Sequence, residues 1–181
     1  MNHYDFHIKF RAIYDRVLAS FENGAEDAST LLDAADVAFL KSIGGRAQDM
    51  FDYAEDATKY GEPDFATALM VEAVRRDYFL TVQNGEPSTA VLDEASMPAK
   101  TDSVRGIEWL PRIISKARAK LRGELPTSLM YGCGGDRRFF KEHDIHPADF
   151  LRAAWAFEDN DDQLIAWVEK RSRMAAQTVR V

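Results

Sequence analysis

The chain of 181 residues contains one cysteine, six prolines and ten glycines. The single cysteine, Cys133, cannot form an intramolecular disulfide, so the disulfide-rich class of small secreted protein is excluded and a reducing compartment is favoured. The low proline and glycine content excludes collagen-like and low-complexity chains. The composition is therefore that of an ordinary globular protein that forms its own core.

Long apolar runs are also missing. No segment approaches the roughly 20 consecutive apolar residues that a membrane-spanning helix requires. Residues 1–11 are too polar and charged for the core of a signal peptide. We therefore expect a soluble protein that is not exported and that resides in the cytoplasm.

Apolar residues at helical spacing, by contrast, are abundant. In the first 85 residues they recur every three to four positions in four segments, and each segment is followed by a glycine that can end a helix. The pattern predicts four helices, over about 6–22, 33–43, 46–60 and 64–83, with Asp33 as a possible N-cap of the second, Gly61 at the end of the third and Asp64 at the start of the fourth.

The periodicity disappears between Glu86 and Arg105 and then returns in four further segments, over about 110–122, 136–143, 147–157 and 161–174. The sequence thus predicts an all-α protein of about eight helices in two lobes, with no significant sheet. The expected domains are an N-terminal four-helix lobe at 1–85, an irregular connector at 86–106 and a C-terminal helical lobe at 107–181.

Negative charge dominates the chain but is unevenly distributed. There are 23 basic and 30 acidic residues, a net charge of −7, yet residues 105–138 hold eight basic and three acidic side chains. On the helix predicted there, Arg112, Lys116 and Lys120 share the face opposite the apolar stripe. This basic outer face either binds an anion, is simply solvated, or contacts the acidic residues of helix 46–60. The acidic residues in question are Asp49, Asp52 and Asp56, which we expect on an exposed face.

A glycine-rich loop follows the basic helix. Gly132, Gly134 and Gly135 surround Cys133, and a helix is expected to begin near Asp136. Three glycines permit backbone angles at which successive N–H groups converge on an anion, and a helix N-terminus adds its positive end. Arg137 would then add a cation. Alternatively, the glycines only allow the loop to turn and Asp136 caps the helix.

Two residues near this loop offer nucleophilic chemistry. Cys133 precedes a helix N-terminus and two arginines, and both influences favour the reactive thiolate. His143 is a candidate base for it. Because no known spacing supports a Cys-His site here, an inert cysteine remains the alternative. No three- or four-ligand metal pattern is present, so we expect neither a metal nor a cofactor.

Charged residues interrupt the otherwise apolar helix over 64–83. We expect Glu72 to pair with Arg76 at i, i+4, and Arg75 or Asp77 to bond to a neighbouring helix. The alternative is a polar pocket between the lobes in which Arg75 binds a carboxylate or phosphate.

One part of the chain resembles a known family. The string Gly106-Ile-Glu-Trp-Leu-Pro-Arg-Ile-Ile114, the following Lys116-Ala-Arg-Ala-Lys-Leu121, the loop Met130–Arg137 and the terminal Leu164–Val168 are similar to the bacterial domain of unknown function 5069, over about residues 95–170. The resemblance implies a small, mostly helical, cytoplasmic bacterial protein. It implies no activity and no catalytic residues.

These observations favour a binding or interaction module that presents the basic helix and the glycine-rich loop to a small anionic ligand or an acidic protein partner. Nucleic acid is excluded by the acidic chain and the absence of a recognition motif, and a membrane by the lack of apolar runs. The alternative is an enzyme that acts on a phosphate- or carboxylate-bearing small molecule. The candidate catalytic residues are Cys133 and His143, and the candidate ligand-binding residues are Arg112, Lys116, Gly132, Gly134, Gly135, Arg137 and Arg75.

Overall fold

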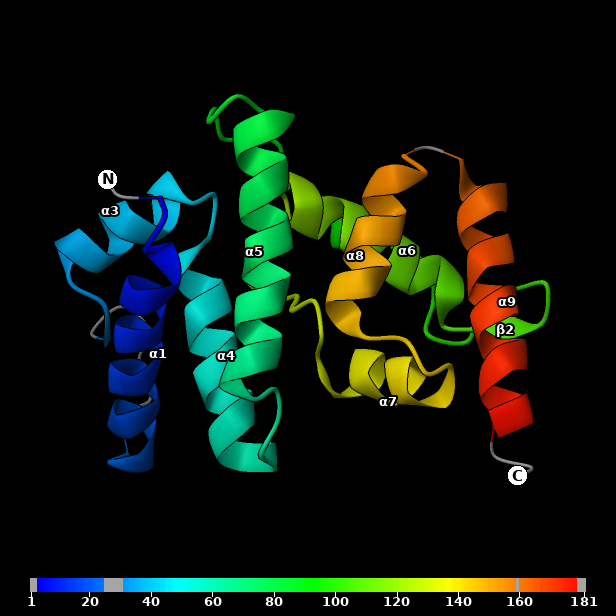
Figure 1. Ribbon diagram of the computed structural model, residues 1–181, viewed down its shortest axis with the longest axis horizontal. Coiled ribbons are helices and arrows are strands. Elements are labelled where there is room, and N and C mark those ends of the chain that lie inside the picture. The colour runs from blue at the N-terminus through cyan, green and yellow to red at the C-terminus, as the bar shows by residue number, and fades with distance from the viewer. Residues whose placement is uncertain (1–2, 25–30, 159, 179–181) are drawn as a thin grey trace. The chain divides into compact units, whose positions relative to one another are not determined.

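The computed structural model describes residues 3–24, 31–158 and 160–178 (Figure 1). The described residues form eight α-helices and a single two-stranded sheet, so the predicted all-α class is confirmed. They divide into two compact units, Met1–Ser88 and Thr89–Val181. None of the described helices combines the length and the apolarity that crossing a bilayer requires. The predicted domains, a lobe at 1–85, a connector at 86–106 and a lobe at 107–181, stay predictions.

The first unit contains the helices α1 (Phe6–Glu22), α3 (Ala34–Ser42), α4 (Ala47–Tyr60) and α5 (Phe65–Thr81). The residues that the sequence indicated as helix ends do begin or end helices in the structure. Asp33 caps α3 in a capping box, Gly61 ends α4 in a left-handed conformation, and Asp64 caps α5. α1 packs against α4 and α5, and its apolar stripe supplies the core of the unit. Phe10, Ile13 and Val17 are at most 1% exposed.

The polar residues of the first unit differ from the prediction in two respects. Asp49 is buried instead of exposed and accepts a hydrogen bond from Nε of Arg46 at 3.1 Å. Glu72 does not pair with Arg76: it accepts a hydrogen bond from the Tyr53 hydroxyl at 2.8 Å, whereas Arg76 binds the neighbouring Asp77. Both differences arise because the unit buries these groups, and a buried carboxylate requires a nearby donor.

The second unit begins with a segment without regular secondary structure and a short 3₁₀ turn (Glu94–Ser96), followed by the hairpin strands β1 (Ser103–Val104) and β2 (Ile107–Glu108). The sequence did not predict this hairpin. Arg105 and Gly106, both in left-handed conformations, form its two-residue turn. Because each strand has only two residues, no alternating pattern was long enough to reveal it.

Four helices complete the second unit: α6 (Leu110–Arg122), α7 (Gly134–Glu142), α8 (Pro147–Ala156) and α9 (Asp161–Thr178). α6 packs against β1 and against α8, and α8 packs against α9. α7 begins at Gly134, two residues before the expected start, and Cys133 is its N-cap residue. Arg105 in the hairpin turn holds α9 through ion pairs to Asp162 and Glu169.

Candidate functional site

The basic face predicted on α6 is not a solvent-exposed surface. Lys116 and Lys120 are only 2% and 1% exposed, although both have a charged end. Arg112 is partly buried and donates from Nη1 to the Pro98 carbonyl at 2.7 Å. The prediction of a basic outer face is therefore wrong for the two lysines, because β1, α7 and α8 leave little of α6 facing solvent.

The partner of Lys116 is Asp136, which lies at the centre of a buried polar cluster. Asp136 is 0% exposed and accepts hydrogen bonds from the Lys116 ammonium, from Nε1 of Trp109 at 2.9 Å and from the Gly132 N–H at 2.9 Å. We call these four residues the Asp136 cluster. The carboxylate thus accepts hydrogen bonds from all three donors, and a buried charged pair needs such hydrogen bonds to offset the loss of its water.

Asp136 also explains the glycine-rich loop. Gly132 has φ of +90°, and its N–H points at the carboxylate of Asp136. Arg137 donates from Nη1 to the Gly132 carbonyl at 2.8 Å. The group that the N–H of Gly132 binds is thus a carboxylate of the chain itself. Asp136 is not the N-cap residue that the sequence suggested but the third residue of α7.

Tyr131 anchors the start of this loop. Its hydroxyl donates to the Pro147 carbonyl at 2.8 Å, and its ring contacts that of Phe140. Burial raises the pKa of Tyr131 well above the ordinary value, and the charge of nearby Asp136 acts in the same direction. Tyr131 therefore stays a neutral hydrogen-bond donor that ties the loop to the start of α8.

Trp109 connects the hairpin to α7. It has φ of +71°, a left-handed conformation that is rare for a large side chain and costs on the order of 1–3 kcal/mol. The surroundings hold it there: its N–H donates to the Asp102 carbonyl, its indole N–H donates to Asp136, and its ring lies against Gly135. A Cβ at Gly135 would come 2.5 Å from Cη2 of Trp109, so only glycine allows this approach.

The two candidate catalytic residues do not form a pair. The Cys133 thiol receives a contact from the Lys116 ammonium, with 3.3 Å between Nζ and Sγ. Nδ1 of His143 instead lies 2.7 Å from Oγ of Ser172 in α9. No hydrogen bond joins Cys133 to His143 among the described residues. The catalytic role predicted for them stays a prediction, now without a nucleophile–base contact to support it.

A polar pocket lies beside the Asp136 cluster, between the hairpin and α7. It has a volume of about 280 Å³. One wall is the hairpin turn with β2 and Trp109, and the other is one side of α7 together with His143, the residue that follows it. We call it the hairpin pocket. Its lining residues are Gly106, Ile107, Glu108, Trp109, Gly135, Arg138, Phe139, Glu142 and His143.

Three charged groups line the hairpin pocket: the guanidinium of Arg138 and the carboxylates of Glu108 and Glu142. All three side chains belong to exposed residues. Within the part of the chain that the structure describes, Arg138 forms no ion pair or hydrogen bond. The pocket therefore offers a cation and two anions to a molecule from outside.

His143 adds a neutral group to the same lining. The Ser172 hydroxyl donates its only proton to the Val168 carbonyl at 2.9 Å, so the His143 nitrogen Nδ1 must carry a proton and donate to Ser172. This assigns the Nδ1–H tautomer and leaves Nε2 as an acceptor. Burial lowers the pKa of His143, while the charge of Glu142 acts in the opposite direction.

We expect NMR titration to place the pKa of His143 below its ordinary value of 6.5. A lowered pKa means that His143 binds a proton more tightly in the unfolded chain than in the folded protein. The contribution of neutral His143 to the free energy of unfolding is therefore fully present above pH 6.5 and is lost as the pH falls below it. Replacing His143 by glutamine should reduce this part of the acid dependence of unfolding. A His143 pKa above 6.5 would contradict the assignment.

Of the predicted ligand-binding residues, the structure brings Lys116, Gly132 and Arg137 to the Asp136 cluster or its edge, and Gly135 to the hairpin pocket. Gly134 is the first residue of α7. Arg75 belongs to the first unit, where it is 3% exposed and donates to Gln83 at 2.7 Å. Burial lowers the pKa of Arg75. These ligand-binding roles stay predictions.

Sequence reasoning missed Trp109 and Arg138 as site residues. Arg138 appeared only as one of the eight cations of residues 105–138 and as one of the two arginines after Cys133, and nothing in its local sequence distinguishes it from Arg137. The two differ because successive residues of a helix point about 100° apart. Within the described residues, no group of three or more His, Cys, Asp or Glu side chains has the arrangement of a metal site.

Part of the chain matches the model of a known family. Residues 96–180 match the model of the family described as Domain of unknown function (DUF5069), which confirms the resemblance inferred from the sequence. The matched region contains the hairpin and all four helices α6 to α9, and with them the Asp136 cluster and the hairpin pocket. Neither the curated proteins nor the solved structures include a match to the chain.

Proposed function

We propose that residues 96–180, the region that matches the DUF5069 model, form a non-catalytic binding module, and that its hairpin pocket binds a small molecule carrying a carboxylate or phosphate. Arg138 would hold that anionic group. The observation that carries the proposal is the contrast between Arg138 and the other cations of residues 105–138.

The other cations of residues 105–138 have partners within the chain. Arg105 and Arg118 bind acidic residues of α9, Lys116 binds Asp136, and Arg122 binds Glu124. Arg112 and Arg137 donate to backbone carbonyls, and Lys120 is buried. The other cations of residues 105–138 thus interact within the chain. Arg138 differs from them, because it lines a pocket and has no such partner among the described residues.

The chemistry of the pocket defines the ligand further. A guanidinium recognises a carboxylate or a phosphate through two parallel N–H···O bonds. Glu108, Glu142 and Nε2 of His143 are acceptors, so they suit hydroxyl or amine donors on the same molecule. The volume of about 280 Å³ is below the range of roughly 300–1,000 Å³ that is usual for small-molecule sites, which favours a small polar ligand.

The enzyme alternative has less support in the geometry. A cysteine nucleophile needs a base within hydrogen-bond reach, but Cys133 contacts Lys116 and His143 contacts Ser172. Cys133 is also not among the residues that line the hairpin pocket. The expected cytoplasmic location, bacterial origin and acidic partner stay predictions.

The test is thermal unfolding in inorganic phosphate, succinate or phosphoserine, each compared with chloride at the same ionic strength. A ligand of the native state at a hundred times its Kd should add about 2.7 kcal/mol to the free energy of unfolding. Arg138→Ala should weaken the binding of the effective anion by about ten- to a hundredfold, because it removes a charge-assisted hydrogen bond worth on the order of 1.5–3 kcal/mol.

The matched control is Arg152→Ala, which removes an arginine on α8 whose partner, Asp149, is exposed. This variant should keep the anion response. The proposal fails if no anion acts beyond the effect of chloride, or if Arg138→Ala and Arg152→Ala respond alike.

A further inference from the structure

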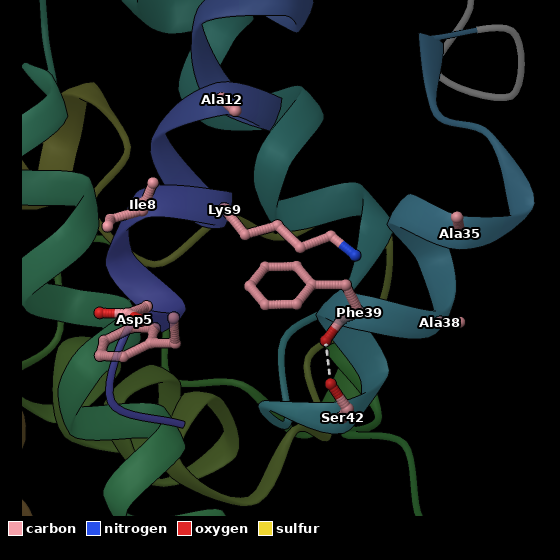
Figure 2. Close-up of a pocket in the computed structure, with 9 residues that line it drawn as sticks. Asp5, Ile8, Lys9, Ala12, Ala35, Ala38, Phe39 and Ser42 are labelled. Atoms are coloured by element: carbon pink, nitrogen blue, oxygen red, sulfur yellow. Dashed lines mark hydrogen bonds between the residues drawn. The ribbon is translucent and has the colours of Figure 1, made fainter. Parts of the chain in front are cut away.

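The first unit contains an apolar groove that has no part in the proposed function. It lies between α1 and α3 and has a volume of about 830 Å³ (Figure 2). We call it the α1/α3 groove. Its lining residues are Asp5, Phe6, Ile8, Lys9, Ala12, Ala35, Ala38, Phe39 and Ser42.

The residues that line each wall of this groove are spaced like those on a helix surface that packs against another helix. From the N-cap of α1 the lining positions include 5, 8, 9 and 12, and on α3 they are 35, 38, 39 and 42. Both sets follow the pattern i, i+3, i+4, i+7, which marks one stripe along a helix. Two such stripes facing one groove form the surface on which a third helix packs.

Small side chains make the close approach of a helix feasible. Ala12, Ala35 and Ala38 line the groove and are exposed, so a neighbouring backbone meets only methyl groups there. Ile8 on the same surface is 59% exposed, although it is one of the larger apolar residues of α1. Helices in contact lie about 8–10 Å apart, the shorter distances occurring where the side chains between them are small.

The lining of the groove holds one cation, Lys9, and one carboxylate, Asp5, which already has an interaction within the chain. Figure 2 shows Lys9 extending from α1 toward α3, with its ammonium 4.9 Å from the centroid of the Phe39 ring. Within the described residues Lys9 has no carboxylate partner, whereas Arg11 and Arg16 of the same helix bind Asp15 and Asp36. An acidic residue on the occupant would complete this site.

From these observations we infer that the α1/α3 groove binds an amphipathic helix of a partner protein. The helix presents apolar residues at i, i+3, i+4 and i+7 to the groove, and an aspartate or glutamate beside this stripe meets Lys9. The groove spans positions i to i+7 on each wall, about 10 Å at 1.5 Å per residue, so roughly two turns of the partner helix are in contact.

To test this inference, peptides that bind the full-length protein are selected from a displayed library of random 16-residue peptides. We expect the bound peptides to share the i, i+3, i+4, i+7 apolar pattern with an adjacent acidic residue, and to gain helical circular dichroism on binding. Ala38→Trp, which fills the groove, should weaken their binding at least about tenfold, because the steric block removes the apolar contacts.

Charge reversal separates docking in the groove from a general loss of structure. Lys9→Glu should weaken the selected peptides, and a peptide with lysine in place of its acidic residue should recover binding to Lys9→Glu but not to the parent protein. Lys59→Glu, at an exposed lysine on α4 that binds Glu55, is the matched control and should leave binding unchanged.

Three outcomes of the peptide selection would overturn the inference. They are selected peptides without a helical apolar pattern, selected peptides that bind Ala38→Trp and Lys9→Glu as tightly as the parent protein, and a library that yields no specific binder. If Ala38→Trp instead abolishes a concentration-dependent dimer seen by analytical ultracentrifugation, the occupant is a second copy of the chain and the partner helix is rejected.

Discussion

Replacing Asp136 by alanine is expected to lower the free energy of unfolding by about 3–5 kcal/mol, because it leaves the ammonium of Lys116 buried without its counter-charge. Lys116 is 2% exposed and Asp136 is 0% exposed, so water cannot take over the role of the lost carboxylate. The indole N–H of Trp109 and the N–H of Gly132 lose the same acceptor. Urea denaturation followed by circular dichroism measures the change.

Asp149→Ala is the control for this substitution. Asp149 also carries a carboxylate on a helix of the second unit, but its pair with Arg152 is more than half exposed on both sides. Exposed pairs of this kind contribute roughly 0–1 kcal/mol. An Asp136→Ala variant as stable as Asp149→Ala would show that the Asp136 cluster does not hold the glycine-rich loop, α6 and α7 together.

Replacing Gly135 by alanine is expected to destabilise the protein by about 1–3 kcal/mol, the usual cost of forcing an extra methyl group into a packed contact. The new Cβ would lie 2.5 Å from Cη2 of Trp109, so the indole ring must move. Trp109 is not free to do so, because its ring also donates a hydrogen bond to Asp136 and its backbone is in the left-handed region.

The neighbouring residue offers a matched control. Gly134→Ala makes the same chemical change in the same turn of α7, yet its Cβ would meet only the Nη2 atom of Arg137, at 3.8 Å. Because alanine is a better helix former than glycine by up to about 1 kcal/mol, this variant should be as stable as the parent or more stable. Equal destabilisation of the two variants would contradict the packing of Trp109 on Gly135.

The helices of the fold were largely predictable from the sequence. The apolar stripe through Phe10, Ile13 and Val17 indicated both the existence of α1 and the face that it buries. Asp33, Gly61 and Asp64 marked helix ends because capping and left-handed termination depend on local residue type. The hairpin at 103–108 was not predictable, since two-residue strands contain no measurable period.

Some of the residues singled out in the sequence lie close together in the structure, but the interactions that they form were not predictable. Lys116 and Gly132 belong to the Asp136 cluster, and Gly135 and His143 line the hairpin pocket. Their interactions depend on which groups the packing buries, and helix periodicity does not reveal this. Lys116 and Lys120 looked like a solvent-exposed basic face because the sequence shows the apolar stripe of α6 but not the elements that cover its other sides.

By itself, then, the sequence determined the helical class, the positions of most helix ends and the resemblance confirmed at residues 96–180. Each of these depends on residues close together along the chain. Only the tertiary structure decided that Asp136 neutralises Lys116, that Trp109 rests on Gly135 and that Arg138 lines a pocket. Lys116 and Asp136, for example, are 20 positions apart along the chain, and the burial that determines their charge pairing arises only when the helices pack.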